Sequence, residues 1–347
     1  MATRHHDPTT DSAAGAVTED PLADYLRAQA TEFLRALRLH RETGAGVGGS
    51  RESVDAARAL RRSARRISGS LHTFQPLLDT DWSEDMRPEL AWVSGTLAME
   101  HAHAARLERL LAALHRLSGS GALPDRPAVV GRAGGAADRG NLTVGAAKAG
   151  ALLERQLTLA RTRAHSTALQ ALGSSRFHAV ADKVALLASE VPLTRPAASG
   201  DLLPLAAAAQ ERLTDAVAAL PLVTAGSPYN AEALVHGLSP DTTAPHPQDA
   251  PWHQVRLLLR LHRYAREVVL GEDADGDARL LTAGQALDRH RDASEAAAAA
   301  AQAARTPRIA PATAYALGVL HADQRHEVEA ARYAFQRCWE KESVGTP

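Results

Sequence analysis

Apolar residues recur at spacings of three and four positions along most of the chain, which is the period of an amphipathic α-helix. The first such segment begins at Pro21 and continues through Leu22, Leu26 and Phe33 until the glycines at 44–49 interrupt it. No segment shows the strict alternation that is typical of a β-strand. Further helices are predicted over about residues 51–78, 84–117, 142–172, 175–191, 199–219, 252–271, 276–305 and 310–341.

Glycine, proline and polar residues separate these helices. They predict a turn at 79–83, a loop at 118–140 and a long connection between two halves at 221–251. The polar residues 1–19 are expected to form a disordered tail. Long helices with short connections pack as antiparallel bundles. We therefore predict an all-α fold over 20–341, with a first bundle at about 20–220 and a second bundle at about 252–341.

Composition limits the function more than the fold. The 347 residues hold 39 Lys and Arg against 40 Asp and Glu, so any anion site must come from local clustering of charge. The single cysteine, Cys338, excludes an internal disulfide framework. The first residues lack an apolar signal segment, and no apolar run approaches the ~18 residues that span a bilayer. We expect a cytoplasmic protein with no membrane partner.

One predicted helix carries a stripe of cations. In the segment WHQVRLLLRLHRYARE at 252–267, Glu267 is the only carboxylate. At ~100° per residue, the residues at offsets 0, 3, 7, 10 and 11 from the histidine share one face. They are His253, Arg256, Arg260, Arg263 and Tyr264.

The first half of the chain holds a similar segment, ESVDAARALRRSARR. Counted from Asp55, arginines stand at the same offsets of 3, 7 and 10, and two more lie beside them. The two copies suggest an internal repeat. Guanidinium groups suit phosphate oxygens, so a repeating anion is the natural partner of such stripes. The arginines of the first copy are Arg58, Arg61, Arg62, Arg65 and Arg66.

The spacing His-x-x-Arg-x-x-x-(Arg/Lys)-x-x-Arg-Tyr, with an Arg-rich counterpart early in the chain, resembles the CHAD family, the conserved histidine α-helical domain. ESVDAARALRRSARR resembles the opening helix of that family, and ALQALGSSRFHAVADKV its middle region. QALDRHRDASEAA is similar to its penultimate helix. The resemblance runs from about Asp20 to Lys341.

This resemblance implies two helical bundles related by pseudo-twofold symmetry around a basic cavity or groove. The implied ligand is inorganic polyphosphate, bound through Arg, Lys and His side chains, with no catalytic role and no cofactor. Family members often accompany CYTH-type triphosphate-hydrolysing domains or associate with polyphosphate granules. The second stripe matches the family motif completely, and Arg58, Arg62 and Arg65 match the first.

The first half departs from the family pattern at three places. Asp55 stands where the motif has histidine, and Ser63 replaces an arginine. His101 and Ala102 occupy the position of an Arg-Asp pair, which Arg291 and Asp292 supply in the second half. An acid that faces a polyanion lowers affinity, so we expect the helix at 252–271 to dominate binding. Protonation of His253 is expected to raise affinity below about pH 6.5.

Three alternatives stay open. A degenerate member of the family could serve as a helical scaffold or protein-interaction module without an anion site. A metal-dependent enzyme would need Glu-x-x-His pairs, which the chain approaches at Glu100–His103 and Asp323–His326. Nucleic-acid binding is disfavoured by the neutral total charge and the few aromatics. The glycine-rich GAGVGG at 44–49 follows a predicted helix rather than a strand, which argues against a nucleotide site.

Overall fold

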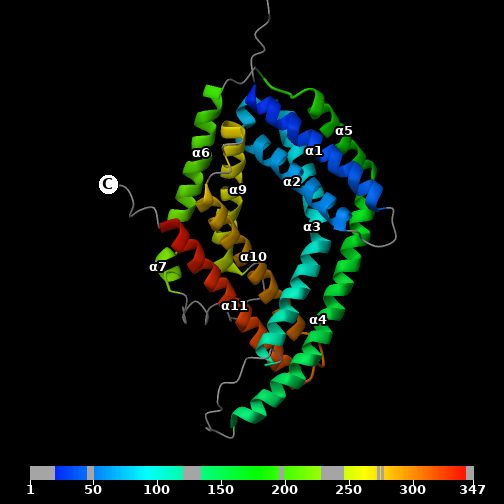
Figure 1. Ribbon diagram of the computed structural model, residues 1–347, viewed down its shortest axis with the longest axis vertical. Coiled ribbons are helices and arrows are strands. Elements are labelled where there is room, and N and C mark those ends of the chain that lie inside the picture. The colour runs from blue at the N-terminus through cyan, green and yellow to red at the C-terminus, as the bar shows by residue number, and fades with distance from the viewer. Residues whose placement is uncertain are drawn as a thin grey trace, which may run out of the picture.

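The part of the chain that the computed structural model describes contains ten α-helices, two short 3-10 helices and no β-strand (Figure 1). That part comprises residues 20–44, 51–119, 134–194, 199–227, 246–271, 274 and 277–340. The predicted all-α fold is confirmed. The predicted tail at 1–19, the glycine-rich stretch at 45–50 and the middle of the predicted connection at 228–245 lie outside these residues. None of the described helices combines the length and apolar character needed to cross a membrane.

The helices follow the apolar periodicity closely. Their bounds are α1 Pro21–Gly44, α2 Arg51–Thr73, α3 Thr80–Leu117, α4 Gly134–Leu172, α5 Ser175–Ser189, α6 Ser199–Ala218, α7 Leu222–Ala225, α9 Ala250–Leu270, α10 Ala278–Ala304 and α11 Pro311–Glu340, with the 3-10 helices η1 Gln75–Leu77 and η2 Pro247–Asp249.

Several predicted boundaries are wrong. The helix predicted over 51–78 ends at Thr73, and the 3-10 helix Gln75–Leu77 follows it. The expected turn at 79–83 belongs to α3, because the side chain of Asp79 accepts a hydrogen bond from the backbone N–H of Trp82 at 2.9 Å and caps the helix there. The expected loop at 118–140 extends too far, because α4 begins at Gly134. Residues 120–133 of that predicted loop lie outside the described part of the chain. Glycine lowers helix propensity by only about 1 kcal/mol per residue, so the glycines of this stretch do not prevent a long helix from extending through them.

Three apolar clusters hold the helices together. The first cluster lies where α1, α2 and α5 meet the start of α3, and it includes Phe33, Ile67 and Phe177. The second joins the C-terminal end of α3 and the N-terminal half of α4 to α10 and α11. The third joins α6, α9, α10 and the end of α11 around Trp252 and Phe335.

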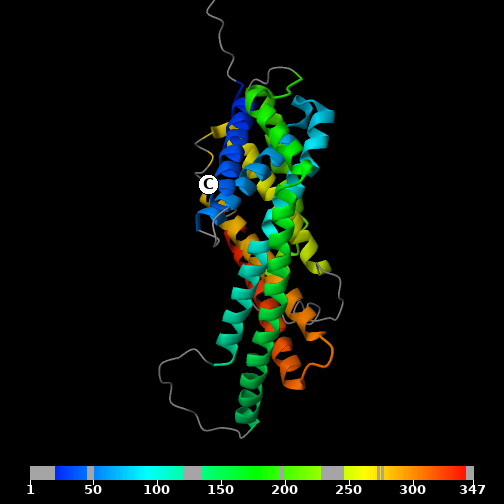
Figure 2. The ribbon, with the colours of Figure 1, turned by 90° about the vertical axis from the view of Figure 1, so that its right-hand side faces the viewer.

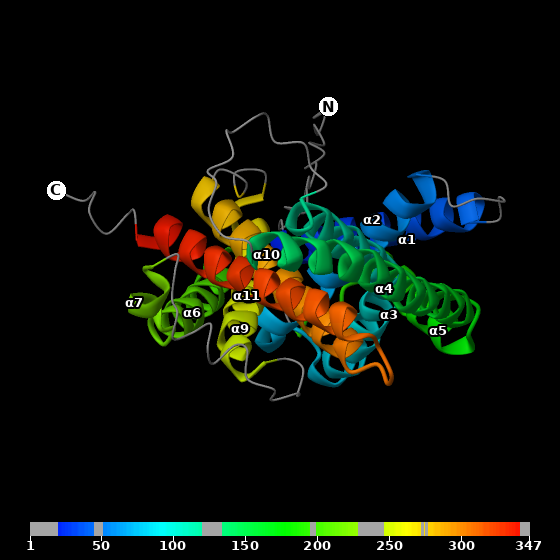
Figure 3. The same cartoon turned by 90° about the horizontal axis from the view of Figure 1, so that it is seen from below.

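The first and second halves of the chain pack against each other through several helices. α3 and α4 run nearly the full length of the molecule side by side (Figure 2). Seen from below, α11 extends from α7 to the lower parts of α3 and α4 (Figure 3). α6, which precedes the predicted connection at 221–251, packs along α9. The division into bundles at 20–220 and 252–341 and the pseudo-twofold symmetry stay predictions.

Candidate anion-binding site

α2 and α9, the two helices with arginine stripes, cross in close contact. At Gly69 on α2, an added Cβ atom would lie 2.6 Å from Cδ2 of Tyr264 on α9. No side chain larger than hydrogen fits there without a shift of the tyrosine ring, so glycine sets how closely the two helices approach. Tyr264, a predicted binding residue, therefore packs at the crossing.

A polar contact fixes the same crossing. Arg66 on α2 donates from Nε to Glu267 on α9 at 2.6 Å and from Nη2 at 3.2 Å. Tyr25 on α1 donates its hydroxyl to the same carboxylate at 2.8 Å. Burial, together with Glu267, raises the pKa of the Tyr25 hydroxyl, while Glu267 outweighs burial and raises the pKa of Arg66. Arg66 is thus engaged by a carboxylate, and Glu267 joins the three helices α1, α2 and α9.

Beside the crossing, arginines from three helices lie within reach of one another's charge. Burial, then the charges of Arg61, Arg256 and Arg291, lower the pKa of Arg65 to about 10. Burial, then Arg256 and Arg65, lower the pKa of Arg260 to about 10. We call Arg61, Arg65, Arg256, Arg260 and Arg291 the cationic cluster.

Three members of the cationic cluster have no carboxylate partner among the described residues. Arg65 donates from Nε to the hydroxyl of Ser94 on α3 at 2.9 Å. The buried Nε atoms of Arg61 and Arg260 have no hydrogen-bond partner. Buried donors without acceptors are costly, since each loses its bonds to water. An anion between α2 and α9 would supply the missing acceptors.

The other two members of the cationic cluster, Arg256 and Arg291, form ion pairs with exposed carboxylates. Arg256 pairs with Asp288, whose side chain is 57% exposed, and Arg291 pairs with Asp292, which is 48% exposed. Glu295 accepts from Arg106 on α3 and lies 3.8 Å from Nε of Arg291. Exposed ion pairs are each worth only ~0–1 kcal/mol. Both carboxylates are accessible from solvent, while the side chains of Arg256 and Arg291 are less exposed, at 13% and 32%.

The remaining predicted arginines lie outside the cationic cluster. Arg58 pairs with Asp55 at 3.1 Å and donates from Nη2 to Nε2 of His101 at 3.2 Å. Arg62 is exposed. Arg263 lines a separate small pocket between α9 and α10, together with Arg266 and Asp277.

His253, the first residue of the second stripe, lies at the edge of the cationic cluster. Its buried Nε2 atom has no hydrogen-bond partner. Burial lowers the pKa of His253; Asp249 and Glu295 oppose this, while Arg256 and Arg291 reinforce it. Without ligand, the imidazole of His253 therefore stays neutral to a lower pH than an exposed histidine does.

A model of the CHAD domain matches residues 28–301 of the chain. The chain belongs to the CHAD domain family. Among solved structures it is similar to PptA from Streptomyces chartreusis, with 74% sequence identity and a TM-score of 0.76. The match covers 93% of this chain and 99% of that one. No curated protein matches it.

Two of the residues that depart from the family motif contact or lie near the arginines of α2. Asp55 forms an ion pair with Arg58 on the same helix. Burial, then the charges of Arg58 and Arg61, lower the pKa of His101. The predicted binding residues do not include Arg291, although the Arg291–Asp292 pair was a usable signal. They also omit Ser94, since a lone serine on a helix carries no signal of its own.

The two residue pairs considered for a metal have other partners in the CHAD fold. Glu100 accepts from His165 at 2.9 Å and lies 3.8 Å from Arg161. Asp323 pairs with Arg116 at 3.2 Å. Within the described ranges, no three His, Cys, Asp or Glu side chains are grouped so that they could hold a metal ion.

Proposed function

We propose that this protein binds inorganic polyphosphate through the cationic cluster, in a basic groove between α2 and α9. The observation that carries the proposal is a set of three arginines on α2 and α9 that have no carboxylate partner among the described residues: Arg61, Arg65 and Arg260. Arginines that lower one another's pKa destabilise a fold unless an anion compensates their charge. Membership of the CHAD family supports the same ligand class.

The chemistry favours a repeating phosphate over a single small anion. Each guanidinium can donate two parallel hydrogen bonds to phosphate oxygens. A chain of phosphates could contact Arg65 and Arg260 first and then displace Asp288 from Arg256. In this proposal Arg58, Arg62 and Arg263 contact the chain only where it leaves the cluster, and Arg66 and Tyr264 hold the crossing. His253 adds a donor when it is protonated.

The protein in this proposal is a binding protein and not an enzyme. The cationic cluster contains no nucleophile beside a general base, and its carboxylates serve as exchangeable partners of arginines. Polyphosphate granules and a CYTH-type partner remain part of the proposal and follow only from the family resemblance. A cytoplasmic location also remains part of it, and it follows from the sequence pattern.

A titration with long-chain polyphosphate tests the proposal. We expect Arg260→Glu to weaken binding by at least about a hundredfold, because a charge-assisted contact is lost and a repulsive one is added. Arg41→Glu on α1 is the matched control, since Arg41 is exposed and lies outside the cluster. Affinity should fall steeply as salt rises. Equal effects of the two variants would locate the site elsewhere.

The same titration addresses the scaffold alternative. That alternative is favoured by the carboxylates that already engage Arg58, Arg256 and Arg291. It predicts that wild-type protein shows no saturable binding at low salt. Binding that does not depend on salt would also contradict the proposed site.

A further inference from the structure

A buried carboxylate stands at the start of α9, one turn before His253. Asp249 is 0% exposed and occupies the N-cap position, yet its side chain accepts no hydrogen bond from the first turn of the helix. An aspartate at this position ordinarily caps the backbone N–H groups. The carboxylate of Asp249 therefore accepts its hydrogen bonds from other helices.

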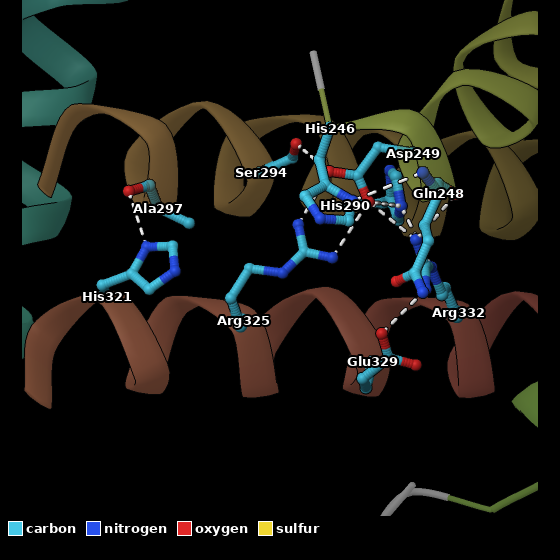
Figure 4. Close-up of polar contacts among 10 residues, drawn as sticks. All are labelled: His246, Gln248, Asp249, His290, Ser294, Ala297, His321, Arg325, Glu329 and Arg332. Atoms are coloured by element: carbon cyan, nitrogen blue, oxygen red, sulfur yellow. Dashed lines mark hydrogen bonds and ion pairs between the residues drawn. The ribbon is translucent and has the colours of Figure 1, made fainter. Parts of the chain in front are cut away.

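Those contacts reach into α10 and α11 (Figure 4). Arg325 donates to both carboxylate oxygens of Asp249 at 2.7 and 3.2 Å, and Arg332 donates from Nη2 at 2.6 Å. Ser294 adds a hydroxyl donor. Burial alone would raise the pKa of Asp249, but Arg325, His290 and Ser294 outweigh it and lower the pKa to about 2.

The network extends from Asp249 to His290. Arg332 donates from Nε to Nε2 of His290 at 3.3 Å, so this nitrogen accepts and the other ring nitrogen carries the proton. Burial, then Arg332, lower the pKa of His290 to about 3. His290 is therefore neutral, and its 3.6 Å approach to Asp249 is not an ion pair.

His290 in turn provides the surface on which His253 rests. The two imidazole rings meet edge to face, with centroids 5.5 Å apart and an angle of 77°. On its other side, His290 stacks with Trp252 at 5.6 Å. The guanidinium of Arg332 lies 5.3 Å from the Trp252 ring, so the same arginine contacts both partners of the stack.

We propose that Asp249 is a positioning residue of the anion site: through Arg332 and His290 it fixes the ring of His253 beside Arg256 and Arg291. The carboxylate also adds the nearby negative charge that favours the protonated form of His253. Arg256 on the same helix and Arg291 on α10 oppose protonation, while Glu295 on α10 supports it. The inference rests on the proposed function only where His253 meets a polyanion.

Ligand-free protein tests the positioning directly. The ring carbon of His253 is followed by NMR as pH is lowered, in wild-type protein and in Asp249→Asn. The variant should lower the pH at which His253 titrates, since a favourable negative charge is lost. Glu329→Gln is the matched control, because it removes a buried carboxylate that pairs with Arg332 without breaking the link to α9. An unchanged titration in Asp249→Asn overturns the inference.

Binding provides the second readout. At a pH where His253 is protonated, Asp249→Asn and His253→Gln should each weaken polyphosphate binding by about three- to tenfold, and the double variant by no more than either alone. Effects that multiply would show that Asp249 acts on the fold in general and would overturn the inference.

Two further outcomes are decisive. If Asp249→Asn does not fold, Ser294→Ala replaces it in the test, because this variant removes one hydrogen-bond donor from the Asp249 carboxylate. Ser294→Ala should then change the pH at which His253 titrates and should not change the titration of His165. An unchanged His253 titration would overturn the inference. If wild-type protein binds no polyphosphate, the proposed function fails, whereas the ligand-free titration still decides the role of Asp249.

Discussion

Arg65 and Arg260 face each other from α2 and α9, and the pKa of each guanidinium falls to about 10 through burial and neighbouring arginines. The charged form of each is therefore less stable in the fold than in the unfolded chain. This cost is present at neutral pH and disappears only as pH rises above about 10. Binding of an anion would reduce this cost. In a structural ion pair, by contrast, a carboxylate of the protein already compensates the arginine.

Arg260→Gln should therefore raise the free energy of unfolding of the ligand-free protein by about 1 kcal/mol while it weakens polyphosphate binding by about tenfold or more. Urea denaturation gives the first quantity and calorimetric titration the second. Arg41→Gln on α1 is the control and should change neither. A clear loss of stability in Arg260→Gln would mean that this arginine holds the fold together.

His253, at the edge of the cationic cluster, and His101, beside Arg58, should make polyphosphate binding depend on pH. Burial lowers the pKa of both His253 and His101. Without ligand, their contribution to stability is present above about pH 6.5 and is lost as pH falls through their lowered folded pKa values. With ligand, phosphate favours the protonated rings, so affinity should rise as the solution is acidified, beginning below pH 6.5.

Titrations between pH 5 and pH 8 measure this rise. His253→Gln should flatten it by removing one of the two histidines. His165→Gln should leave it unchanged, because His165 pairs with Glu100 outside the cluster. The idea fails if affinity is constant over this range in wild-type protein.

The sequence could predict that arginines share a helix face, because that follows from the period of 3.6 residues. It could not predict which of them lack a partner. Arg65 and Arg66 are adjacent in sequence, yet only Arg66 meets a carboxylate, and that residue, Glu267, is 201 positions away. Likewise, Asp249 lies in a segment predicted as a connection, and its partners become visible only when α11 packs against α10.

At the scale of whole elements, the crossing of α2 over α9 decides where the two stripes meet. The helices themselves were predictable: the expected helix at 252–271 corresponds to Ala250–Leu270. Their approach depends on Gly69, whose missing side chain leaves room for Tyr264. A glycine within a helical pattern does not reveal which helix will approach it, so the contact between Gly69 and Tyr264 could not be predicted from the sequence.

Replacement of Gly69 tests this account. In Gly69→Ala the new methyl group would meet the Tyr264 ring, so we expect a loss of about 1–3 kcal/mol in the free energy of unfolding and weaker polyphosphate binding. Gly95→Ala on α3 is the matched control, because an added Cβ there meets nothing within 4 Å. The control should be neutral or more stable by up to about 1 kcal/mol, since alanine favours a helix. Equal stabilisation by both replacements would contradict the close crossing.

At the scale of the whole molecule, the cationic cluster joins parts of the chain that are far apart in sequence. Its members come from α2, α9 and α10, and α3 contributes Ser94 and Arg106 at its margin. The formal net charge of the chain is −1, so the site arises from the way the fold gathers arginines and not from a basic composition. A ligand in this position contacts helices that separate when the protein unfolds.

Long-chain polyphosphate should therefore raise the melting temperature. A ligand present at a hundred times its Kd adds about 2.7 kcal/mol to the free energy of unfolding, because it binds the folded chain only. Differential scanning fluorimetry with long-chain polyphosphate, and with orthophosphate at the same phosphate concentration, measures the effect. Orthophosphate should give a much smaller shift, since one phosphate cannot bridge α2 and α9. The double variant Arg65→Gln/Arg260→Gln should melt at the same temperature with and without polyphosphate. A full shift in that variant would mean that polyphosphate stabilises the protein through another surface.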